Sequence, residues 1–69
     1  MRPLSETQRR VLAVIRSAIA DTGEAPSVRE IAAGAGLRST STVHYQLGRL
    51  EKAGYLKREP GRNRSIRLT

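Results

Sequence analysis

The side chains that could do chemistry gather between residues 38 and 52, and they are hydroxyls, a phenol, an imidazole and cationic groups. With one His, no Cys and only 6 Asp and Glu among 69 residues, we expect no metal site, no carboxylate dyad and no cofactor. Ser and Thr hydroxyls can bond several base edges of duplex DNA, and an aromatic ring can touch a thymine methyl. The residue types therefore favour binding over catalysis.

The spacing of these side chains predicts a helix at about residues 40–53. Val43, Leu47 and Leu50 are four and three residues apart, so they share one inward face. The opposite side and its edges carry Ser41, Thr42, His44, Tyr45, Gly48, Arg49 and Lys52. We expect the N-terminal half of this helix to enter a major groove, with its C-terminal cations nearer the phosphates.

Some of these residues also have a purely structural interpretation. Tyr45 is either a base contact or a cover for the segment that follows, and His44 taken alone resembles a solvated helix residue more than a base reader. Gly48 costs about 1 kcal/mol relative to Ala inside a helix. It is either tolerated or lets the helix lie close to the DNA backbone. Ser5 and Ser27 are interpreted as helix caps.

Two further helices are marked by capping boxes, in which a Ser and a Gln or Glu three residues later satisfy each other's backbone amides. Ser5 begins one at about residues 6–22, and Ser27 begins another at about residues 28–35. Their apolar faces are Val11, Leu12, Ile15, Ala18 and Ile19 in the first and Val28, Ile31, Ala32 and Ala35 in the second. Both faces are expected to pack into one core.

A short turn joins the second and third predicted helices, which is the arrangement of a helix-turn-helix. Gly36 ends the second helix, where the turn is expected to need a positive φ. Ala32 allows close approach of the two helices, and Leu37 is expected to be a buried plug in the turn. The residues expected to pack between the helices are Ile31, Leu37, Val43 and Leu47.

The end of the chain changes to the period-two pattern of strands. Residues 55–59 and 64–68 flank a Pro-Gly turn, and Ile66 and Leu68 alternate with polar residues. A basic hairpin directly after the third helix is a wing. The expected fold class is therefore mainly α with a small β-hairpin, a winged helix-turn-helix of three helices and a two-stranded antiparallel wing, as a single domain over residues 1–69.

The charge balance points to a polyanion partner. Lys and Arg number 13 against 6 Asp and Glu, for a net charge of +7, and the cations are concentrated toward the C-terminal segment. The residues expected to contact the DNA backbone are Arg38, Arg49, Lys52, Lys57, Arg58, Arg62 and Arg64. At the hairpin tip, Arg62 and Arg64 fit a phosphate clamp or a minor-groove probe better than a merely solvated turn.

Several stretches resemble the N-terminal DNA-binding domain of the LexA-type SOS repressors, and together they cover essentially the whole chain. The matching stretches are residues 4–12, 23–32, 36–43, 50–56 and 64–68. They contain Pro-Ser-x-x-Glu-Ile-Ala, Gly-Leu-x-Ser and Leu-Glu-x-x-Gly-Tyr-Leu, a combination far more specific than a bare helix-turn-helix. Residues 39–47 look like the recognition segment of the actinobacterial and Gram-positive members.

The resemblance implies repression through a palindromic operator in promoters of DNA-damage genes. By family position, the base-reading residues would be Ser39, Ser41, Thr42, His44 and Tyr45. His44 and Tyr45 replace the acidic pair of the enterobacterial members, so no operator sequence is carried over. Full-length repressors of the family continue into a self-cleaving Ser-Lys peptidase domain that also dimerises. Neither activity is carried over to this chain, which is either one domain of a longer repressor or a small stand-alone paralogue.

We therefore expect a non-enzymatic repressor that binds double-stranded DNA sequence-specifically and occludes its operator. The chain should be a monomer alone and bind as two copies on an inverted repeat. It has no apolar run of about 18 residues and no signal peptide, so we expect no membrane association and a place at the bacterial nucleoid in the cytoplasm. The alternatives are a basic RNA- or ribosome-binding domain, and a winged-helix protein-interaction module.

Overall fold

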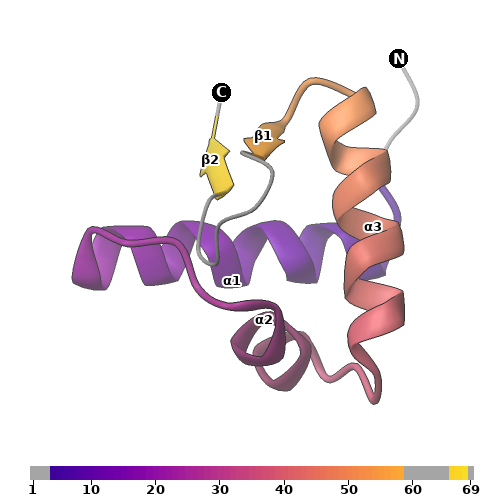
Figure 1. The fold of residues 1–69 in the computed structure, drawn as a ribbon, viewed down its shortest axis with the longest axis horizontal. Coiled ribbons are helices and arrows are strands. Elements are labelled where there is room, and N and C mark those ends of the chain that lie inside the picture. Colours follow the sequence, from indigo (N-terminus) through magenta and orange to yellow (C-terminus); the bar gives the residue numbers. More distant parts are fainter. Residues whose placement is uncertain (1–3, 59–65, 69) are drawn as a thin grey trace.

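The computed structural model describes residues 4–58 and 66–68, which form helices and a small sheet in the order α1, α2, α3, β1, β2 (Figure 1). The elements are α1 Glu6–Thr22, α2 Val28–Ala35, α3 Thr40–Lys52, β1 Leu56–Arg58 and β2 Ile66–Leu68. The first two helices have the predicted bounds, and the third ends one residue earlier than predicted, at Lys52. The predicted fold class is confirmed.

Both predicted capping boxes form. Ser5 Oγ accepts the backbone N–H of Gln8 at 3.1 Å, and Gln8 Oε1 accepts the backbone N–H of Ser5 at 2.9 Å. Ser27 and Glu30 repeat this arrangement at 3.2 and 2.9 Å. Because the first amides of a helix have no partner within it, each box satisfies two donors that would otherwise need water. Local sequence therefore sets where α1 and α2 begin.

The turn between α2 and α3 depends on Gly36, whose φ is 72° as the sequence predicted. This left-handed backbone favours glycine, and it allows the N–H of Leu37 to reach the carbonyl of Ala32 at 2.8 Å. Ser39 then caps α3 by accepting the N–H of Thr42 at 3.4 Å. The turn is short, and α2 is seen nearly end-on where α3 runs up the view in Figure 1, so the two helices cross.

The core lies where the helices meet the sheet. Its buried residues are Val11, Leu12, Ile15, Ala25, Ile31, Ala32, Ala35, Val43, Leu47, Leu50, Leu56 and Ile66. Leu56 and Ile66 come from the two strands, so the sheet packs on the helices, as an isolated hairpin needs for stability. Pro26, which directly precedes the capping residue of α2, is also buried.

The expectation that Leu37 is a buried plug is wrong. Leu37 is partly buried and packs against the edge of the core. It directly follows the left-handed Gly36, and the surface turn leaves one side of the Leu37 side chain open to solvent. The apolar residue type correctly indicated contact with the core, but the conformation of the turn determines how deeply Leu37 is buried.

The strands pair antiparallel in a register that places three apolar residues and Arg58 on one face and two cations on the other. The partners are Leu56 with Leu68, Lys57 with Arg67 and Arg58 with Ile66. Leu56 and Ile66 point into the core, while Lys57 and Arg67 are exposed, which confirms the predicted alternation. Tyr55 was predicted as the first strand residue, but it lies in the bend before β1, which begins one residue later at Leu56. The Pro-Gly turn and the predicted strand residues at positions 59, 64 and 65 lie outside the described residues.

Helices α1 and α2 pack closely at Gly34. A methyl group on Gly34 would lie 2.9 Å from Cγ2 and 3.1 Å from Cγ1 of Val14. Because both Val14 methyls are this near, rotation about χ1 exchanges one close contact for another. Gly48 in α3 has more room, since the nearest atom to a methyl group there would be Nη2 of Arg58 at 3.9 Å. Two helical glycines thus have different surroundings.

We expect Gly48→Ala to stabilise the fold by up to about 1 kcal/mol, the usual gain of Ala over Gly in a helix. Gly34→Ala should instead destabilise it by about 1 kcal/mol, because overpacking costs roughly 1–3 kcal/mol and exceeds that gain. Thermal unfolding followed by circular dichroism measures both changes. The Gly34→Ala penalty should shrink in a Val14→Ala background. Equal stabilisation by the two alanines would contradict the close packing at Gly34.

Candidate nucleic-acid interface

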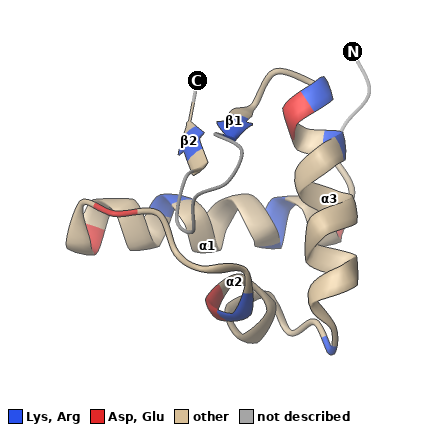
Figure 2. Ribbon diagram, in the orientation of Figure 1, with Lys and Arg blue, Asp and Glu red and all other residues tan. Residues whose placement is uncertain are grey.

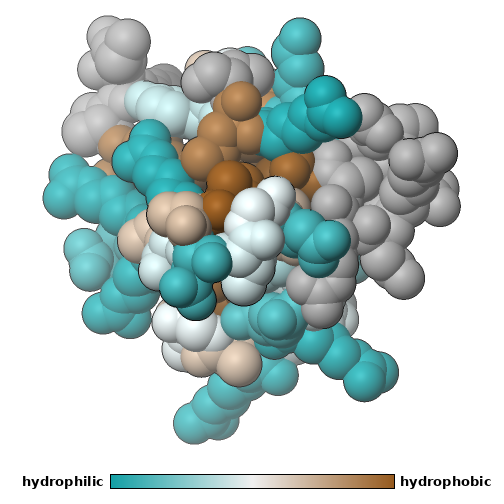
Figure 3. Space-filling model, turned by 90° about the vertical axis from the view of Figure 1, so that its left-hand side faces the viewer, coloured by the Kyte–Doolittle hydropathy of each residue, from teal (hydrophilic) through white to brown (hydrophobic). Residues whose placement is uncertain are grey.

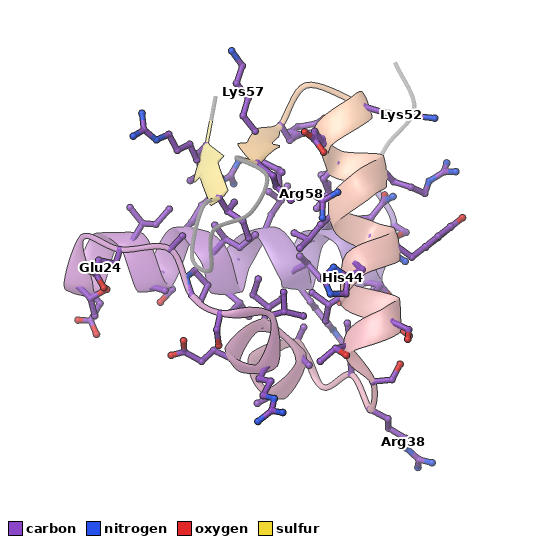
Figure 4. All side chains as sticks on the ribbon, viewed as in Figure 1. Glu24, Arg38, His44, Lys52, Lys57 and Arg58 are labelled. Atoms are coloured by element: carbon purple, nitrogen blue, oxygen red, sulfur yellow. The ribbon has the colours of Figure 1, made fainter. Side chains whose placement is uncertain are left out.

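The outward face of α3 is fixed by the residues that the helix buries. Val43, Leu47 and Leu50 are 0–1% exposed, so the rotation of the helix about its axis is set. The exposed residues of the helix include Ser41, Thr42, His44, Tyr45, Arg49 and Lys52, with Gly48 half-buried. The predicted division of α3 into a core face and a solvent face is confirmed, and Figure 4 shows how its side chains project.

Tyr45 provides a large open surface in the middle of this face. It is 61% exposed, so its ring is accessible to a partner. The guanidinium carbon of Arg49, one turn later, lies 5.9 Å from the ring centroid. This is a cation–π distance, and it places a positive charge directly beside the aromatic surface.

The N-terminal end of α3 is organised by two hydroxyl groups. The Oγ of Ser39 and the Oγ1 of Thr42 are 3.2 Å apart and share a hydrogen bond, and Ser39 also caps the helix. Both residues are exposed. Two of the five predicted base-reading residues therefore contact each other, and Ser39 has a structural role whether or not it contacts a base.

Cations flank the polar face of α3 at both ends. Arg38 lies in the turn before the helix and Lys52 is its last residue (Figures 2 and 4). Both are exposed, as is Arg49 one turn before Lys52. Positive groups on either side of an uncharged polar strip suit a groove bordered by phosphates. The predicted backbone contacts Arg62 and Arg64 lie outside the described residues.

Two like charges stand directly opposite each other in the sheet. Lys57 and Arg67 are cross-strand partners, and both are exposed. The exposed side of the hairpin therefore carries two cationic side chains next to each other.

Arg58 is joined to α3 by an ion pair. Its Nε donates to Oε1 of Glu51 at 3.2 Å, and the two side chains are 31% and 40% exposed. Nη2 of Arg58 also lies over Gly48, close to where a methyl group on that residue would stand. Sequence analysis proposed Arg58 as a phosphate contact but missed Glu51. A pair seven residues apart across a helix end follows no periodic pattern, so no signal in the sequence pointed to it.

The side of the molecule away from α3 is different in character. Asp21 and Glu24 lie near the C-terminal end of α1, and Glu30 lies in α2 (Figure 2). A shallow open groove of about 510 Å³ is lined by Ala13, Val14, Ser17, Ala18, Asp21, Pro26 and Glu30. The view toward the end of α1 shows an apolar area with hydrophilic side chains on its left and at its upper right (Figure 3).

The described part of the chain shows no metal centre and no membrane span. Among residues 4–58 and 66–68, no three His, Asp or Glu side chains are placed to hold a metal ion together. None of the helices in these ranges is long and apolar enough to cross a bilayer.

Helices α2 and α3 form a helix-turn-helix, and α3 presents polar side chains between cations. A basic antiparallel hairpin follows α3. This combination defines a winged helix-turn-helix DNA-binding domain. The chain matches the LexA DNA binding domain family over residues 1–65. It belongs to that family.

Similar proteins are found in corynebacteria and mycobacteria, in agreement with the actinobacterial character predicted from the recognition segment. The chain is 56% identical over 63 residues to the LexA repressor of Corynebacterium diphtheriae, covering 91% of this chain and 27% of that protein. It is 49% identical over 65 residues to the LexA repressor of Mycobacterium leprae, covering 94% and 28%. The chain thus spans about a quarter of the length of these relatives, and the family that it matches is a DNA-binding domain rather than a catalytic one.

We expect Ser41→Ala and Tyr45→Ala each to weaken binding to a preferred duplex by about 1–3 kcal/mol, the usual value of a direct base contact. Both side chains are exposed, so the melting temperature should change little. Fluorescence anisotropy with labelled duplexes measures the affinities. Ser17→Ala, an exposed hydroxyl of α1 in the groove on the other side, is the matched control. If both α3 variants bind like this control, α3 is not the base-reading element.

Proposed function

We propose that the chain is the sequence-specific DNA-binding part of a LexA-type transcriptional repressor, which blocks polymerase by occupying an operator. The observation that carries this proposal is the polar, cation-flanked outward face of α3 in a chain of the LexA DNA-binding family. A protein helix fits the major groove of B-form DNA, where each base pair presents a distinct pattern of donors and acceptors. The operators would lie in front of DNA-damage genes, in the bacterial nucleoid.

The residues of α3 and its N-terminal turn would divide into two roles. The base-reading set is Ser39, Ser41, Thr42, His44 and Tyr45. Short hydroxyls allow the helix to lie deep in the groove, and the Tyr45 ring suits a thymine methyl. These contacts would give sequence preference, because phosphate contacts alone carry no sequence information.

The cationic residues would hold the DNA backbone. They are Arg38, Arg49, Lys52, Lys57 and Arg58, together with Arg62 and Arg64 from the predicted hairpin tip. Each phosphate contact releases a condensed counterion and makes binding weaker as salt rises. The described cations stand at both ends of α3 and on β1, so the phosphates on either side of the groove would each meet positive charge.

Selection of bound sequences from a pool of random duplexes tests the proposed function most directly. We expect a defined half-site to emerge, and its inverted repeat to bind two copies of the chain. An RNA duplex of the same sequence should compete poorly, because the major groove of A-form RNA is too narrow for a helix. Recovery of no sequence preference, or equal binding to RNA, would contradict the proposal.

The wing arginines give a second prediction. Replacing Arg62 and Arg64 with Ala should weaken binding to selected and random duplexes about equally. The slope of log affinity against log salt should fall by about 0.9 for each phosphate that the variant no longer neutralises. Anisotropy titrations at several salt concentrations measure this slope. An unchanged slope would mean that these two residues do not contact the DNA backbone.

We further propose that residues 1–69 act as a single domain that is monomeric alone, since most apolar side chains of the described helices and strands pack in or against one core. Two copies would occupy an inverted repeat, with half-sites about one helical turn apart. For residues 1–69 tested by themselves, cooperativity should be modest, because two separate copies gain no effective concentration from a covalent link. Analytical ultracentrifugation, followed by titration of one and two half-sites, checks this. A stable dimer without DNA would overturn this stoichiometry.

A further inference from the structure

We propose that Glu51 is a positioning residue for DNA binding. Its carboxylate holds the Arg58 guanidinium against α3, so that the Nη groups of Arg58 are presented to a DNA phosphate where α3 meets the hairpin. This inference rests on the DNA-binding function proposed above. According to this inference, Glu51 strengthens specific binding even though its negative charge lies close to the negatively charged DNA.

The fold places both members of the pair. Arg58 is the last residue of β1 and pairs with Ile66 across the sheet. Leu56, two residues earlier, is 1% exposed, so β1 is anchored in the core. Glu51 lies in the last turn of α3, and Figure 4 shows Arg58 between β1 and that helix.

Contacts on two sides define the orientation of the guanidinium. Its Nε donates to Glu51 Oε1 at 3.2 Å. Its Nη2 lies 3.9 Å from where a Cβ of residue 48 would stand, and residue 48 is glycine. Gly48 and Glu51 are three residues apart and so lie on adjacent turns of one helix side. The guanidinium therefore spans these two turns instead of extending into solvent from the strand.

This orientation leaves donors for a phosphate. An Arg side chain has five N–H groups in a planar fork, and the hydrogen bond to Glu51 uses the one on Nε. The Nη groups can then donate to phosphate oxygens, which Arg binds with two parallel bonds. The Arg58 side chain is held by the ion pair to Glu51 and is still 31% exposed, so it remains accessible. A side chain that is already held in one orientation loses less entropy when it binds.

The location fits the edge of a groove. Helical geometry puts Gly48 on the same side of α3 as Ser41 and Tyr45, the residues proposed to read bases. Lys57 precedes Arg58 on β1 and is exposed. The guanidinium thus lies between the proposed base-reading face and the hairpin, where a DNA backbone has to pass if α3 occupies the groove.

Charge alone makes the opposite prediction. Replacing Glu51 with Gln removes one negative charge, and fewer negative charges should tighten binding to any DNA. In the proposed arrangement the Nη groups of Arg58 meet a phosphate only when α3 is fully seated in its preferred site, unlike the arginines at the predicted hairpin tip. The same replacement should therefore weaken binding to the preferred duplex and spare binding to random DNA. The sign of the change on the preferred duplex therefore separates positioning from simple electrostatics.

The test compares Glu51→Gln with Glu24→Gln, which removes the same charge near the other end of the molecule (Figure 4). The probes are a duplex selected by the wild-type protein from a random pool and a scrambled duplex of equal length, followed by anisotropy. We expect Glu51→Gln to weaken binding to the selected duplex about 3- to 10-fold, the range for immobilising one long side chain. Glu24→Gln should bind both duplexes at least as tightly as wild type. In an Arg58→Lys background, Glu51→Gln should cause no further weakening of specific binding.

The alternative outcomes are distinct. Glu51→Gln binding the selected duplex as tightly as Glu24→Gln would overturn the positioning role and leave the proposed function intact. A parallel loss on both duplexes would also overturn it, because a purely structural role weakens all binding together. If the wild-type protein selects no preferred duplex, both the proposed function and this inference fail.

Discussion

The arrangement of the proposed interface depends on the burial of one stripe of α3. Val43, Leu47 and Leu50 are fully enclosed by the rest of the core, and burying each such side chain contributes about 1.5–3 kcal/mol. Turning the helix by one residue would expose part of this stripe, so its rotation is strongly determined. The side chains that face outward are therefore a direct consequence of the ones that face inward.

The hairpin is held to this helix by two kinds of contact. Leu56 is buried in the shared core, which fixes the start of β1 close to the end of α3. The Glu51–Arg58 pair then joins the two elements at the surface. An exposed ion pair adds little stability, so the apolar contact determines the position of the strand and the ion pair determines the orientation of one cation. This division explains how a small domain can present a fixed set of charges without burying any of them.

The parts of the fold that sequence analysis predicted well are those determined by near neighbours. Ser5 and Ser27 find their capping partners three residues away, and Gly36 ends its helix through its own backbone conformation. The rotation of α3 also followed from the spacing of its apolar residues. A local pattern was enough in each case because the interacting groups lie within one or two helical turns.

The features that escaped prediction are those formed between elements. The contact of Gly34 with Val14 joins two helices through residues 20 positions apart in the chain, and no periodicity marks such a pair. Leu37 has the residue type of a core position, but the turn leaves it at the rim. The assignment of individual side chains to bases or phosphates rests on family resemblance and on exposure, because the shape and charge of a protein surface do not specify which DNA atom each side chain contacts.

The central claim is that the outward face of α3 reads the DNA bases. The most direct test is to map the amide chemical-shift changes of the isotope-labelled chain when a selected duplex is added. We expect the shifts that differ between a selected and a scrambled duplex to be concentrated in Thr40–Lys52 and the turn before it. Residues that line the groove on the α1 side, such as Ala13 and Ser17, should remain unaffected by either duplex. Sequence-dependent shifts centred on that groove, with α3 unchanged, would contradict the claim.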